Sequence, residues 1–199
     1  MSNEVINFSI NLDQDSLIDY FYTLKLVSIN ETHVSHKSEF EKTFGVKIKS
    51  NKVGDFKKEI AGKVPSETHV RTDLIAECDK NFPIIKNLLD NVSKSIHGIK
   101  FGLVAYFLQK TGEDVPMHQD YPYRKNSLLV IPLHGSKRYN FPKSNAVTYY
   151  KNGGEYQILE PVIMNVMESH AVKNIDVDRL SLHIEIPNLS IYDINNILL

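Results

Sequence analysis

Residues 164–186 read MNVMESHAVKNIDVDRLSLHIEI, and the last eight of them give the clearest structural signal in the chain. From Arg179 to Ile186 polar and apolar side chains alternate strictly. Successive side chains of a strand point to opposite faces, so the pattern predicts a strand with two unlike faces. The apolar face carries Leu180, Leu182, Ile184 and Ile186. The polar face, directed to solvent or to a polar cavity, carries Arg179, Ser181, His183 and Glu185.

Other short strands are expected before this one, separated by turns that contain glycine. They are residues 99–109, 127–133, 147–150, 156–159 and 162–167. Many short strands at such spacing predict a sandwich or barrel of the jelly-roll kind.

The N-terminal half has a different texture. Asp13 or Asp15 is suited to cap a helix that begins near Ser16, and Pro83 is suited to start a helix that runs to Ile96. Residues 31–68 are compatible with either strand or loop. We therefore expect one α+β domain over residues 1–199, in which residues 1–98 are a mixed helical support. Residues 99–186 would form the jelly roll, and residues 187–199 a C-terminal tail.

The composition is that of an ordinary soluble domain, with 42% hydrophobic and 24% charged residues. Cys78 is the single cysteine, so no intramolecular disulfide can form, which fits a reducing compartment. The N-terminus has no signal-peptide pattern, and no stretch approaches the roughly 18 apolar residues of a membrane helix. These features predict a cytoplasmic protein without a membrane partner.

The charge distribution also bears on partners. With a net charge of -1, the chain lacks an overall basic surface for nucleic acid, which is therefore not the expected partner. Residues 121–154, however, contain no acid. The basic residues in this run are Arg124, Lys125, Lys137, Arg138, Lys143 and Lys151. If the run surrounds a pocket, it would favour an anionic substrate.

The candidate chemistry begins at His118-x-Asp120, since two residues at this spacing on an extended chain point to the same side. A third ligand from a distant strand would complete two histidines and one carboxylate, a set suited to iron(II) with open coordination positions. His170 is the candidate for that ligand, and His183 is an alternative. Nine residues beyond His170, Arg179 offers a planar guanidinium that matches a carboxylate.

The stretch from about Leu103 to Ile186 resembles the 2-oxoglutarate and iron(II)-dependent dioxygenases, in particular the aspartyl/asparaginyl β-hydroxylase and prolyl hydroxylase branches. The resemblance rests on "VPMHQD", "SLLVIPLHG" and the distal-histidine segment quoted first. Within these, the family pattern is His-x-Asp, a distal His, and then Arg-x-Ser on the final strand. Here those residues are His118, Asp120, His170, Arg179 and Ser181. The resemblance covers less than half of the chain.

The resemblance implies a double-stranded β-helix in which His118, Asp120 and His170 bind Fe(II). Arg179, with Ser181, would hold the far carboxylate of the co-substrate 2-oxoglutarate. O2 would be consumed and succinate and CO2 released, with ascorbate as a reductant. The strand at 127–133 lacks the usual polar residue at Leu129-Val130, so the second contact to 2-oxoglutarate stays open among Tyr106, Ser127 and Tyr149.

The substrate is open as well. A hydroxylated peptide side chain of the Asp, Asn or Pro type and a small molecule both fit the resemblance. Two other functions compete with a hydroxylase: a cupin-like metal-binding or sensing protein without turnover, and a nucleic-acid demethylase of the same superfamily. Arg179 argues against the first, because a simple metal binder needs no such cation. The second is disfavoured because no Lys or Arg follows Arg179.

Overall fold

The computed structural model describes residues 4–34, 37–64, 73–120 and 125–198. Eleven strands in these ranges form two sheets, and every pairing is antiparallel. The larger sheet contains β1 (Val5–Asn7), β2 (Val27–Ser28), β3 (Leu74–Glu77), β4 (Val104–Gln109), β6 (Ser127–Pro132), β9 (Val162–Met164) and β11 (Arg179–Ile186). The smaller sheet contains β5 (Val115–His118), β7 (Val147–Tyr150), β8 (Glu155–Tyr156) and β10 (His170–Lys173).

The strand order is β1-β9-β6-β11-β4-β3-β2 in the larger sheet and β5-β10-β7-β8 in the smaller one. From β4 to β11 the chain passes back and forth between the sheets, except at the β7–β8 hairpin. Strands β5 and β10 were not among the predicted strands. Each has only four residues, and neither VPMH nor HAVK alternates clearly between polar and apolar.

The helices are α1 (Gln14–Phe21), α2 (Lys37–Phe44), α3 (Val53–Ile60), α4 (Pro83–Ser95) and α5 (Ile191–Leu198), with a short 3-10 turn, η1, at Ile29–Glu31. The two predicted starts are confirmed. The Asp13 side chain accepts a hydrogen bond from the Ser16 amide at 3.1 Å, and Pro83 occupies the first turn of α4. None of the helices in the described ranges has the length and apolar character that crossing a membrane requires.

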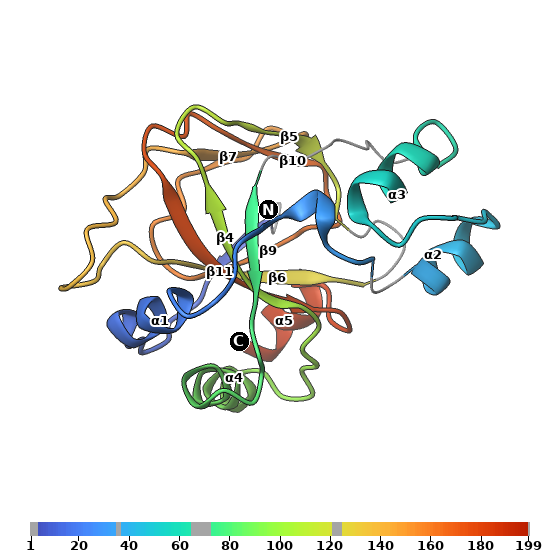
Figure 1. Cartoon of the computed structure of the whole chain (residues 1–199). Coiled ribbons are helices and arrows are strands. Elements are labelled where there is room, and N and C mark those ends of the chain that lie inside the picture. The colour runs from blue at the N-terminus through green and yellow to red at the C-terminus, as the bar shows by residue number, and fades with distance from the viewer. Residues whose placement is uncertain (1–3, 35–36, 65–72, 121–124, 199) are drawn as a thin grey trace.

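The apolar face of β11 lies in the main hydrophobic core, as the alternation predicted. Leu182, Ile184 and Ile186 are fully buried there, together with residues of α1 and α4. Burying a side chain of this size contributes roughly 1.5–3 kcal/mol. Figure 1 shows α1, α4 and α5 together below the larger sheet, whereas α2 and α3 stand apart on the right. The first group therefore supports the sheet from its apolar side.

The helices α2 and α3 have a small core of their own. Phe40 of α2 contacts Phe56 of α3, with 5.0 Å between ring centroids, and Ile48, Ile60 and Val64 complete the cluster. Residues 29–34 and 37–64, which run from η1 past α3, are named the cap below. The cap occupies most of the segment for which the sequence left strand and loop open, and its two longest elements are helices.

Candidate metal centre

His118, Asp120 and His170 come together at one end of the smaller sheet. His118 ends β5 and His170 begins β10, and the two are direct partners across this antiparallel pair. The distance from His118 Nε2 to Asp120 Oδ1 is 3.3 Å, and that from His170 Nε2 to Asp120 Oδ2 is 3.9 Å. One ligand atom from each residue lies within 4.8 Å of the others. The structure thus brings together the three residues that the sequence predicted as a set.

Backbone carbonyls fix the orientation of both imidazoles. His118 Nδ1 lies 2.7 Å from the Pro116 carbonyl oxygen, and His170 Nδ1 lies 3.0 Å from the Glu168 carbonyl oxygen. A carbonyl oxygen can only accept, so each Nδ1 donates, and in the neutral ring Nε2 carries the lone pair that a metal binds. Such support from outside the ligand set is typical of metal-binding histidines.

The arrangement suits a divalent metal ion. In these tautomers two imidazole lone pairs and one carboxylate converge without a hydrogen between them, and a cation compensates such a group of acceptors. The histidines are buried, at 2% and 4% exposure, and Asp120 is partly exposed. Two histidines and one carboxylate on one side, with space on the other, match the donor set and open face of non-haem iron(II) sites.

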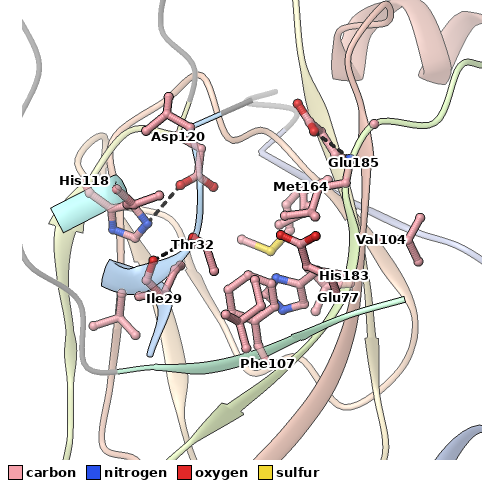
Figure 2. Close-up of a pocket in the computed structure, with 18 of the residues that line it drawn as sticks. Ile29, Thr32, Glu77, Val104, Phe107, His118, Asp120, Met164, His183 and Glu185 are labelled. Atoms are coloured by element: carbon pink, nitrogen blue, oxygen red, sulfur yellow. Dashed lines mark hydrogen bonds and ion pairs between the residues drawn. The ribbon is translucent and has the colours of Figure 1, made fainter. Parts of the chain in front are cut away.

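A cavity of about 650 Å³ adjoins these three residues. Its wall includes His118 and His170 from the smaller sheet, Arg179 from the larger sheet, and Phe56 from the cap. Figure 2 shows part of this wall, with His118 and Asp120 on one side and residues of the larger sheet on the other. The cavity thus lies between the two sheets and is bounded on one side by the cap.

Arg179 is the cation that the polar face of β11 brings to this cavity. Its Nη1 donates a hydrogen bond to Gln109 Oε1 at 3.0 Å, across the β4–β11 pair. Desolvation by burial lowers the pKa of the Arg179 guanidinium to about 10, and the nearby carboxylate of the buried Asp73 opposes that shift. The side chain is therefore positively charged at neutral pH and can bind an anion.

The other predicted contacts to the co-substrate lie elsewhere. The Tyr106 hydroxyl donates to the Leu17 carbonyl oxygen at 2.7 Å, in the core beneath α1. The Ser127 hydroxyl donates to the Leu189 carbonyl oxygen at 2.9 Å. Neither residue lines the cavity, so neither is in place to contact a ligand there. Tyr106 pairs with Leu182, so its side chain points to the opposite face of the sheet from that of Arg179. The sequence does not reveal this, because it does not give the register of the two strands.

Ser181 and Tyr149 also have other neighbours. Ser181 is fully buried, and its Oγ lies 2.9 Å from His183 Nε2. The ammonium of Lys173 lies 5.7 Å from the centre of the Tyr149 ring, which is absent from the cavity wall. His183 itself lines the cavity, but it is not a member of the metal-binding cluster.

Among the polar residues of the cavity wall that sequence reasoning missed, two are buried. Gln109 ends β4 and Thr148 lies on β7, and both are almost completely buried. Gln109 shares strand parity with Phe107, another wall residue, and Thr148 pairs with Val172 of the wall. The sequence shows which residues of these strands share a face. It does not show which of the two faces lines the cavity.

The basic run lies away from the cavity as far as it is described. Arg124 is outside the described residues. Arg138 forms ion pairs with Asp19 and Asp15, which belong to α1, and Lys125 pairs with Asp193 of α5. None of the described basic residues between 125 and 151 lines the cavity. The described part of the basic run therefore does not contribute to the cavity wall, and the expectation of an anionic substrate stays a prediction.

No protein-family model matches the chain, and no curated protein matches it. Solved structures do. The viral collagen prolyl hydroxylase from Paramecium bursaria Chlorella virus-1, in a 2OG complex, aligns with 94% of this chain and 98% of its own at 9% identity, with a TM-score of 0.50. A Pseudomonas putida prolyl-4-hydroxylase aligns with 88% of this chain and 99% of its own at 14% identity, with a TM-score of 0.43.

A 2OG-Fe(II) oxygenase family protein from Burkholderia pseudomallei aligns with 72% of this chain and 82% of its own, at 14% identity and a TM-score of 0.42. At 9% identity the likeness to the viral enzyme concerns the fold alone. The viral enzyme, with the highest TM-score of the three, shares its fold with almost the whole chain.

Proposed function

We propose that this chain is a 2-oxoglutarate- and iron(II)-dependent oxygenase built on a double-stranded β-helix. The alternation of β4 to β11 between the two sheets supports the jelly-roll assignment. The observation that carries the proposal is the joint presence of a His118–Asp120–His170 cluster and a cavity-lining Arg179. A metal site alone would serve many functions, whereas the added cation suits a dicarboxylate co-substrate.

In this proposal His118 Nε2, His170 Nε2 and an Asp120 oxygen hold the iron. When bound, iron(II) would supply the redox chemistry by which one O2 is consumed: one oxygen atom enters the succinate formed from 2-oxoglutarate with loss of CO2, and the other enters a substrate C–H bond as hydroxyl. The carbonyls of Pro116 and Glu168 keep both imidazoles in the ligating tautomer. The Gln119 amide donates to the Met167 carbonyl oxygen at 2.8 Å and stabilises the loop between His118 and Asp120.

Arg179 binds the far carboxylate of 2-oxoglutarate through charge-assisted hydrogen bonds. Gln109 orients the guanidinium from the neighbouring strand, and the buried Thr148 is the candidate for the second polar contact. Between them the wall is apolar, with Val115, Val130 and Val172. These side chains exclude water and strengthen the ion pair with Arg179.

The alternative is a metal-binding or sensing protein of the same fold that performs no turnover. Anaerobic calorimetry distinguishes the two by titrating 2-oxoglutarate into protein with and without Fe(II). An oxygenase should bind one equivalent of 2-oxoglutarate only when iron is present, and Arg179→Gln should weaken that binding. Iron binding without any heat from 2-oxoglutarate would favour the sensor.

The metal site needs a separate control. His118→Ala should remove iron binding, whereas His97→Ala, which changes an exposed histidine outside the cavity, should leave it intact. Equal loss in both variants would mean that His118 has no special role.

A further inference from the structure

A row of residues crosses the larger sheet on the cavity side. Glu77 of β3 pairs with Ala105 of β4, and Ala105 pairs in turn with His183 of β11. Ala105 is small and fully buried, so the side chains on both sides of it have room to meet above it. Glu77 and His183 both line the cavity. In Figure 2 they point into it from the side opposite to His118 and Asp120.

The His183 ring is held in a fixed plane. It stacks on Phe107 with 4.2 Å between ring centroids and 22° between planes. The Ser181 hydroxyl lies 2.9 Å from His183 Nε2, and this hydrogen bond restrains rotation of the ring. We name His183 and Phe107 the ring platform. An aromatic face such as that of Phe107 attracts cations within about 6 Å of its centre.

Negative charge gathers next to the ring platform. Glu77 is exposed, and no described residue forms a hydrogen bond or ion pair with its carboxylate. Glu185, two residues beyond His183, is buried, and its Oε2 accepts a hydrogen bond from the Leu103 amide at 2.9 Å. Glu185 packs so closely on Gly102 that a Cβ there would come within 2.3 Å of the same oxygen. The backbone therefore holds this second carboxylate in place.

Three positively charged residues belong to the described wall: Arg179, Lys57 and Lys80. Arg179 lies six residues from Glu185 along β11, roughly 20 Å at the usual rise per residue. The Lys80 ammonium donates to the Phe101 carbonyl oxygen at 3.1 Å, one residue before Gly102, whose amide bonds the Glu185 carbonyl oxygen, and Lys57 lies on the cap. Arg179 and the two carboxylates therefore lie toward opposite ends of β11, while Lys80, at the carboxylate end, is exposed and bonded to the backbone.

We propose that the substrate carries an ammonium or guanidinium group, which binds the Glu77 carboxylate above the ring platform. This inference rests on the proposed oxygenase function, for which it names the substrate class. 2-Oxoglutarate, an anion, would take the Arg179 end, and the cationic group would take the carboxylate end. The two ligands would then bind without competing, since each end repels the other ligand's charge.

The test uses matched ligands that differ in charge but little in shape. The pairs are arginine with citrulline, lysine with norleucine, and glutamate with glutamine. Binding is measured by calorimetry on zinc-loaded protein with saturating 2-oxoglutarate, where no turnover occurs. The arginine pair is also placed inside a blocked Gly-Gly-Arg-Gly-Gly peptide, so that a free amine and a peptide side chain are tested separately.

The expected result is that the cationic member of a pair binds at least about 10-fold more tightly than its neutral partner, in the free or the peptide form. Glu77→Gln should reduce that preference to about 3-fold or less, while the exposed control Glu113→Gln should leave it unchanged. Equal binding of citrulline and arginine in both forms, or a preference for glutamate, would overturn the inference. So would an intact preference in Glu77→Gln.

The same ligands also separate this inference from the proposed function. Succinate release is measured in parallel with Fe(II), 2-oxoglutarate and each ligand. A charge preference that depends on Glu77, with no succinate formed under any condition, would refute the oxygenase and retain the cation site. Succinate formation with no charge preference in binding would support the oxygenase and refute the cation site.

Discussion

The two faces of β11 differ in what they contact. Leu180, Leu182, Ile184 and Ile186 pack into the main core with α1 and α4, while Arg179, Ser181, His183 and Glu185 face the space between the sheets. One strand therefore serves the stability of the fold on one side and the candidate site on the other. Changes on the two faces should have separable effects, on unfolding and on ligand binding respectively.

The helices also differ in what they contact. Helices α1 and α4 contact the apolar face of the larger sheet, whereas the cap has a separate small core and contributes Phe56 and Lys57 to the cavity wall. The N-terminal half is thus both a support and part of the site. The sequence left open whether this half is more than a support, and the structure places residues of the cap in the cavity wall.

The largest expected effect is the loss of the metal. Asp120→Ala removes the only carboxylate of the candidate ligand set. We expect iron binding and turnover to fall by more than roughly 100-fold, since the loss of even outer partners of metal ligands costs 10- to 100-fold. Metal analysis after gel filtration and a succinate assay measure this. Thermal unfolding of the metal-free variant should match that of metal-free wild type, and a collapsed fold would contradict the division between faces.

The second effect falls on the apolar face. Leu182→Ala leaves a cavity in the main core, where Leu182 is fully buried, and should reduce the free energy of unfolding by about 2–5 kcal/mol. Denaturant titration measures the loss. At a temperature where the variant is folded, its KM for 2-oxoglutarate should equal that of wild type. A large change in KM would show that the two faces are not independent.

The third effect concerns the cation of the polar face. Arg179→Gln removes the charge-assisted contact to the co-substrate, a loss that should raise the KM for 2-oxoglutarate about 10- to 100-fold. Steady-state kinetics with varied 2-oxoglutarate measure the change. Arg138→Gln is the matched control, because Arg138 pairs with Asp19 of α1 outside the cavity. Similar kinetics in both variants would argue against a role for Arg179 in binding.

The smallest effect is expected at the start of α1. Asp13→Ala removes the side-chain cap that accepts from the Ser16 amide and should lower the free energy of unfolding by less than Leu182→Ala does, because the cap is exposed. Turnover should be unchanged, since α1 only supports the sheet. Denaturant titration and the succinate assay together test this. A loss of activity without a loss of stability would mean that α1 contributes to the site.

Local patterns predicted the parts of the structure that local chemistry determines. The alternation from Arg179 to Ile186 gave the strand and its two faces, and the spacing of His118 and Asp120 gave two ligands on one side of the chain. Asp13 and Pro83 marked two helix starts. In each case the signal lies within a few residues and does not depend on register.

What could not be predicted depends on pairing between distant segments. Tyr106 and Gln109 lie on the same strand, yet only the register of β4 against β11 tells which of them faces the cavity. The cap was missed for a different reason. Val53, Phe56 and Ile60 have helical spacing, but several lysines surround them and α3 is only eight residues long. It packs against η1 and against Phe40 of α2, and the sequence does not show these contacts.

The central claim is most directly tested by succinate release from 2-oxoglutarate, with purified protein, Fe(II) and ascorbate and without added substrate. We predict slow turnover in wild type and in His97→Ala, and none in His118→Ala. Wild-type protein that binds iron but neither binds nor consumes 2-oxoglutarate would contradict the claim and favour a metal-binding protein of the same fold.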